Sequence, residues 1–150
     1  MSKCRCKKSK RCLSIELRKK IQRFCQSERK KRKVLCYNYG TVCIGVEDSK
    51  HIFQKCSCSF QCCIEYYSNS SLRAKLSKLG IIGKTTNDNC VLGYCAEPHA
   101  AELLSRRLNS NKVNLIQNNT DKFFFTEALR VRTNQSVKNC IFCKKTFPQL

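Results

Sequence analysis

The sequence lacks the segments that mark a membrane or a secreted protein. Its 150 residues contain no run approaching the ~20 apolar residues that a helix needs to cross a bilayer. The first residues, MSKCRCKKSKRC, are basic but contain no apolar core of a signal peptide. We therefore expect an intracellular protein, in the cytoplasm or nucleus, without an integral membrane segment.

Acidic residues are scarce. Ten Asp and Glu stand against thirty Lys and Arg, which gives a formal net charge of +20. A charge this large indicates a polyanionic partner, nucleic acid first and an anionic membrane surface second. Residues 1–33 alone hold fifteen basic and two acidic residues, which predicts a basic N-terminal segment before a main domain, 34–150, in one globular unit. The run SERKKRK within it fits a solvated linker or localisation signal as well as direct phosphate contact.

Cysteine, by contrast, is abundant, with fourteen residues. Composition alone would allow a scaffold held by disulfides. The missing signal peptide argues against this, and the chain is also longer than the small secreted domains that depend on such bonds. We therefore expect mostly free or metal-bound thiols, with the disulfide framework as an alternative.

Apolar residues recur at helical spacing in three segments. The first is an amphipathic helix with a basic outer face, in which the apolar residues are Leu13, Leu17, Ile21 and Phe24. The second covers about 71–80, with Leu72, Leu76 and Leu79 on one side and Gly80 at its end. The third runs from about Cys95 to Leu108 and buries Ala100, Leu103, Leu104 and Leu108.

Strand-forming residues separate these helices. Two short strands are expected around residues 38–40, one over 112–117 and an extended segment over 122–133, before a short last helix near Cys140. The stretch CSCSFQCC, 56–63, fits no element. This order predicts an α/β fold, a sandwich with helices packed on a small sheet.

Cys140 and Cys143 form the only C-x-x-C in the sequence. This spacing lets both thiolates bind one zinc ion. A Cys-x-Glu pattern occurs twice, at 95–97 and at 63–65, and the first is preferred because it begins a well-defined helix. Cys95 and the C-x-x-C pair are expected at the N-termini of two neighbouring helices, whose dipoles favour thiolates. All three cysteines could then bind one metal ion. Three ligands leave a fourth position for water, which Glu97 could reach without binding the metal.

This constellation resembles the zinc-dependent nucleobase deaminases, whose pattern is His or Cys, any residue, Glu, and later Pro-Cys-x-x-Cys. Here it reads CAE at 95–97 and NCIFC at 139–143, with Asn139 in place of the proline. The sequence CAEPHA, and a chain end within a few residues of Cys143, are most similar to the toxin-type branch of this superfamily. Members of that branch are found at the C-termini of bacterial polymorphic toxins. The resemblance covers about residues 12–146. It implies a compact cytidine deaminase-like three-layer α-β-α sandwich with a short C-terminus.

The resemblance also implies an activity and a site. The activity is hydrolytic deamination of a nucleobase, most commonly cytosine to uracil, in single-stranded DNA or RNA. One catalytic Zn²⁺ would be held by Cys95, Cys140 and Cys143, and Glu97 would move protons. Candidate groups for stacking on bases, with packing in the core as the alternative for each, are Phe60, Tyr66, Tyr67 and Tyr94.

Two other interpretations of the cysteines remain open. A closed structural zinc site would use Cys90, Cys95, Cys140 and Cys143 in a non-catalytic nucleic-acid-binding module, with His99 at the surface or behind the ligands. The remaining cysteines could form a second metal site or stay reduced without a ligand; this set includes Cys4, Cys6, Cys12, Cys56, Cys58, Cys62 and Cys63.

Overall fold

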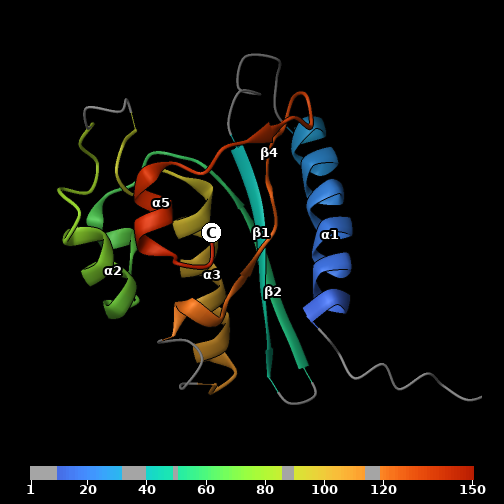
Figure 1. Cartoon of the computed structure of the whole chain (residues 1–150), viewed down its shortest axis with the longest axis horizontal. Helices are drawn as coiled ribbons and strands as arrows, with labels where there is room; N and C mark the ends of the chain where they lie inside the picture. The colour runs from blue at the N-terminus through green and yellow to red at the C-terminus, as the bar shows by residue number, and fades with distance from the viewer. Residues whose placement is uncertain (1–9, 32–39, 49–50, 86–89, 114–118) are drawn as a thin grey trace, which may run out of the picture.

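The structure is a computed structural model that describes residues 10–31, 40–48, 51–85, 90–113 and 119–150. In chain order the described elements are α1 (Lys10–Lys31), β1 (Gly40–Asp48), β2 (His51–Cys58), η2 (Ile64–Tyr66), α2 (Ser70–Ser77), α3 (Ala96–Ser110), η3 (Thr120–Lys122), β3 (Phe124–Phe125), β4 (Ala128–Arg130), β5 (Ser136–Val137) and α5 (Ile141–Thr146). They form a mixed α/β fold with helices on both sides of a sheet (Figure 1).

β1 is the central strand of an antiparallel sheet. β2 pairs with it from Thr41 opposite Cys58 to Asp48 opposite His51. The segment that contains β3 and β4 lies on the other side of β1, and β5 pairs with β4. Among the described strands the order is β2-β1-β4-β5, with β3 also beside β1.

Successive side chains of β1 point to opposite faces of the sheet. Val42, Ile44 and Val46 pack in a core with α3, α2 and the C-terminal segment. Cys43 and Gly45 face α1 on the opposite side. Because both faces are covered by helices, the middle of the strand is fully buried.

The predicted amphipathic helix is confirmed as α1. Its buried residues are Leu13, Leu17, Ile21 and Cys25, so Cys25 takes the place expected for Phe24, which is half-buried. Gly45 allows the helix to lie close to the sheet: a Cβ at this position would be 3.1 Å from methyl groups of Leu13 and Leu17. Because α1 shares a core with the sheet, it belongs to the folded unit, and the expected boundary at 33/34 lies outside the described residues.

The other predicted helices are also confirmed, as α2, α3 and α5. The strands were predicted less well. β2 was not foreseen, because HIFQKCSC lacks a clear alternation of apolar and polar residues; it forms by pairing with β1. The first strand expected before residue 40 and most of the strand expected over 112–117 lie outside the described residues, whereas the extended segment 122–133 contains β3 and β4.

None of the described helices is long and apolar enough to cross a membrane. The longest, α1, combines its apolar stripe with a row of exposed basic residues. Its apolar stripe is already covered by the sheet. The stripe is therefore used for packing within the protein.

We predict that truncation of the α1 stripe destabilises the fold. Leu17 is 0% exposed, so Leu17→Ala should lower the free energy of unfolding by about 2–5 kcal/mol, since methyl groups are lost and a cavity remains. Ile15, on the same helix, is 51% exposed, and Ile15→Ala should change the value by no more than about 0.5 kcal/mol. Urea unfolding followed by circular dichroism measures both. Equal effects of the two substitutions would show that α1 does not pack as described.

Candidate metal centre

The structure brings together the three cysteines that the sequence singled out. The sulfur atoms of Cys95, Cys140 and Cys143 all lie within 4.8 Å of one another, and those of Cys95 and Cys140 are 3.5 Å apart. Sulfurs on a tetrahedral zinc ion are about 3.7 Å apart, given a Zn–S bond of about 2.3 Å. The spacing and the thiol donors of this cysteine group therefore fit zinc. It is the only group of three or more possible metal ligands found among the described residues.

Two helix starts position the cysteine group. Cys95 is the N-cap of α3 and has extended backbone angles (φ −68°, ψ 157°), and Cys140 is the N-cap of α5. The Cys140 sulfur accepts a hydrogen bond from the backbone N–H of Cys143 at 3.4 Å, as expected for a C-x-x-C turn around a metal. The positive end of the α3 dipole also favours a thiolate at Cys95.

The three thiols lie close enough to shift one another's pKa values. Hydrogen bonds from the thiols of Cys143 and Cys95 lower the pKa of Cys140 to about 2. The same interactions with Cys140, reinforced by burial, raise the pKa values of Cys95 and Cys143. Without a cation, the negative charge of one thiolate opposes the ionisation of the other two thiols. A cation bound between the sulfurs would stabilise all three as thiolates.

Glu97 is placed beside the cysteine group. Its side chain is 5% exposed, and its Oε2 lies 3.6 Å from the Cys143 sulfur. Burial raises the pKa of Glu97 and brings the carboxyl closer to a range in which it can exchange protons near neutrality. Pro98 follows in the first turn of α3. Proline has no N–H, and this costs nothing here because N–H groups in the first turn have no partner within the helix.

Other proposed ligands are not brought into this group. Cys90 is half-buried but is not a member of the group, so the four-cysteine closed site is not assembled. Cys63 and Glu65, the second Cys-x-Glu, are exposed. His99, expected at the surface or behind the ligands, is 0% exposed, because α3 packs against β2. Nδ1 of His99 lies 3.0 Å from the Cys58 carbonyl oxygen, to which it is hydrogen-bonded.

The aromatic candidates for base stacking fall into two kinds. Tyr67 is fully buried and donates its hydroxyl to the Gly93 carbonyl, so its assignment as a stacking group is wrong and it is a core residue. Phe60 is 37% exposed, whereas Tyr66 and Tyr94 are half-buried. The Phe60 ring lies 5.3 Å from that of Tyr66 at near-perpendicular orientation.

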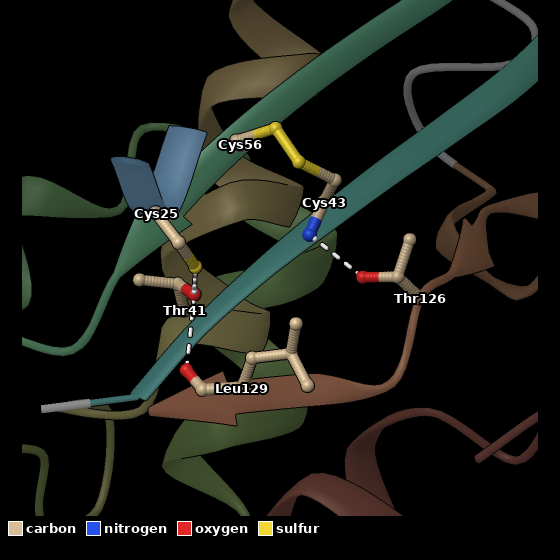
Figure 2. Close-up of a disulfide and its surroundings, with 6 residues drawn as sticks. All are labelled: Cys25, Thr41, Cys43, Cys56, Thr126 and Leu129. Atoms are coloured by element: carbon tan, nitrogen blue, oxygen red, sulfur yellow. Dashed lines mark hydrogen bonds between the residues drawn. A yellow bond between two sulfur atoms is a disulfide. The ribbon is translucent and has the colours of Figure 1, made fainter. Parts of the chain in front are cut away.

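One disulfide was not expected. Cys43 and Cys56 are directly opposite on β1 and β2, with their Cα atoms 4.0 Å apart (Figure 2). On the side away from β2, the Cys43 N–H donates to the Thr126 hydroxyl and the Cys43 carbonyl accepts from the Thr126 N–H. Cys43 and Cys56 are therefore a non-hydrogen-bonded pair, in which facing side chains lie closest. Cys56 is therefore not available to a second metal site.

The remaining cysteines vary in their surroundings. Cys25 is buried beside the disulfide, and its sulfur lies 3.0 Å from the hydroxyl of Thr41, which donates to the Leu129 carbonyl (Figure 2). Cys4, Cys6 and the side chain of Cys12 lie outside the described residues. Sequence reasoning also missed a pairing of Cys62 with His99, because the two are 37 residues apart and belong to no common motif.

We predict one equivalent of tightly bound zinc in the purified protein. Cys95→Ser, Cys140→Ser and Cys143→Ser should each lose it and lower the thermal midpoint, because the metal ties the start of α3 to α5. Cys90→Ser should keep the metal. Elemental analysis by mass spectrometry after dialysis measures the stoichiometry. Loss of zinc from Cys90→Ser would instead support the closed four-cysteine site.

Comparison with known proteins assigns no family to the chain. No family model matches the sequence, and neither the search of curated proteins nor that of solved structures finds a match. A function can therefore be proposed only from the residues and their geometry, and the cysteine group with its buried carboxylate is the most specific chemical feature that the described residues present.

Proposed function

We propose that the protein is a zinc-dependent deaminase that converts a nucleobase, most commonly cytosine to uracil, in single-stranded nucleic acid. The observation that carries the proposal is the carboxylate of Glu97, buried 3.6 Å from one of three clustered thiols. A structural zinc site uses four protein ligands, whereas a catalytic one uses three and leaves one position open. A buried acid–base group next to an open position is what deamination requires.

The order of elements supports the same proposal. Helix α1, the hairpin of β1 and β2, and helix α3 with the first motif are followed by β3 and β4 and then by α5 with the second motif. β4 runs antiparallel to β1 on the side away from β2, and the chain returns along it to the cysteine group. This succession is consistent with a cytidine deaminase-like three-layer sandwich, with the short β4–β5 hairpin before the second motif.

The described residues suggest how the reaction would proceed. Cys95, Cys140 and Cys143 would hold the zinc ion, which would supply a Lewis acid that lowers the pKa of the attacking water. Glu97 would take one proton from the water and pass it to the ring nitrogen. It would then take the remaining proton of the added hydroxyl group and pass it to the amino group, which leaves as ammonia. The pKa of Glu97, raised by burial, suits a group that must both accept and donate protons.

The charge of the chain supports a polynucleotide substrate. A free nucleoside offers no row of phosphates, whereas a formal charge of +20 attracts a strand strongly. Exposed basic residues are carried by α1, and this helix lies on the face of the sheet opposite α3 (Figure 1). We therefore assign these basic residues to binding phosphates of the strand that lie away from the target base. The target base itself must be unpaired to reach the cysteine group.

Substitution of Glu97 tests the catalytic assignment. Glu97→Gln should keep the fold and the zinc but lower conversion of cytosine or adenine in single-stranded oligonucleotides by about 10²–10⁴-fold, because proton transfer is lost. Glu65→Gln is the matched control: it also follows a Cys-x pattern but is exposed, and its activity should be that of the wild type. Sequencing of treated DNA and RNA measures conversion. If zinc-loaded wild-type protein converted neither base in any of these substrates, the enzyme proposal would fail.

Substitution of α1 tests the assignment of its charges. Arg18, Lys19 and Arg23 are exposed, and their joint replacement by Gln should weaken oligonucleotide binding. The slope of log K against log salt should become shallower by about 2, since each phosphate contact to a single strand contributes about 0.7. Glu16→Gln, which removes an exposed acid from the same helix, should not weaken binding. Fluorescence anisotropy over a salt series measures both. An unchanged slope in the triple variant would place the binding surface elsewhere.

A further inference from the structure

Cys62 and His99 form a second reactive pair, separate from the cysteine group. The Cys62 sulfur lies 3.4 Å from Nε2 of His99, and Nδ1 of the same ring lies 3.0 Å from the Cys58 carbonyl oxygen. A ring nitrogen that faces a carbonyl must carry the hydrogen, so Nδ1 is the donor and Nε2 of the neutral ring is the acceptor. The S–H of Cys62 can then point to Nε2 or to the Gly93 carbonyl oxygen, which lies 3.3 Å from the same sulfur. A thiol next to a base that a third group orients is the arrangement of an activated nucleophile.

The histidine ring is held firmly in this orientation. His99 is 0% exposed, and the ring of Phe60 stacks on it at a centroid distance of 3.8 Å and an interplanar angle of 21°. The ring of Tyr66 meets it edge-on at 5.1 Å. Rotation that would move Nε2 away from Cys62 is therefore opposed by packing as well as by the bond to the Cys58 carbonyl.

Backbone carbonyls are positioned to stabilise the charged form of the ring. The Gly93 carbonyl lies 3.3 Å from the Cys62 sulfur, and Gly93 adopts a positive φ of 85° where an added Cβ would be 2.8 Å from Ile82. Burial lowers the pKa of His99, and the nearby carbonyl groups of Cys58 and Gly93 oppose this lowering. Burial raises the pKa of Cys62. The resting pair is thus a neutral thiol and a neutral imidazole.

We propose that Cys62 is a nucleophilic thiol that His99 activates as a general base, and that this pair takes small electron-poor alkenes, such as α,β-unsaturated carbonyl compounds. Cys62 is half-buried and so is reachable by a small reagent, and Tyr66 and Phe60 give the site an aromatic flank. Neither Cys62 nor His99 belongs to the cysteine group, so the proposal does not depend on deaminase activity.

The reaction is balanced without a co-reactant. The S–H proton moves to Nε2 of His99 as the sulfur forms a bond to the β-carbon of the alkene. The π electrons move to the α-carbon, which then receives the proton back from Nε2. The product is a thioether, and the histidine returns to its neutral form.

Competition between neighbouring cysteines tests the proposal. Zinc-loaded, full-length protein is treated with N-ethylmaleimide below stoichiometry, and peptide mass spectrometry gives the rate at each cysteine. Cys63 is adjacent and more exposed, so without activation it should react faster than Cys62. We expect the reverse: Cys62 should be alkylated at least about tenfold faster than Cys63. General base catalysis commonly gives larger rate gains than this. An equal or slower rate at Cys62 overturns the proposal, and this comparison needs no variant.

A histidine variant tests the role of the base. In His99→Asn the side-chain amide can still donate to the Cys58 carbonyl, but no basic nitrogen faces Cys62. The rate at Cys62 should fall about tenfold while that at Cys63 stays the same, in protein whose circular dichroism and zinc content match the wild type. Cys63→Ser should leave the fast reaction of Cys62 intact. A folded His99→Asn protein in which Cys62 reacts as fast as before would contradict activation by His99.

Discussion

The burial of both faces of β1 is the constraint on which the rest of the structure depends. Its alternate residues pack against α1 on one side and α3 on the other, so one strand joins two cores. Close approach of α1 requires the absence of a side chain at Gly45, and close approach of β2 is reinforced by the Cys43–Cys56 bond. α3 and the C-terminal segment are packed on the opposite face, which fixes the surroundings of the cysteine group.

The cysteine group shows how a reactive site is formed from the ends of rigid elements. Cys95 and Cys140 are 45 residues apart, yet each is the residue at which a helix begins, so the packing of two helices brings their sulfurs together. Glu97 lies inside α3 and is buried with it. The same helix carries His99, two residues after Glu97, which contacts Cys62 rather than the cysteine group. One helix therefore contributes residues to both groups of side chains.

The interior of the fold was predictable where a pattern repeats along the chain. The spacing of Leu13, Leu17 and Ile21 was sufficient for α1, and the helices around residues 71–80 and 95–108 were found in the same way. β2 was not, because its residues carry no alternation of their own and take strand geometry from β1. Both base stacking and core packing were left open for Tyr67, because its sequence neighbours do not distinguish the two uses, and its burial decides for the core.

The amino-acid sequence by itself determined the charge, the main helices and the identity of the three clustered cysteines. These follow from composition, from periodicity, and from the Cys-x-Glu pattern at 95–97 and the C-x-x-C at 140–143. Only the tertiary structure decided which other residues meet: the pairing of Cys43 with Cys56, the exclusion of Cys90 and the contact of Cys62 with His99. Those contacts depend on strand register and on how helices pack against the sheet. Both are set by interactions between distant segments, and no local pattern encodes them.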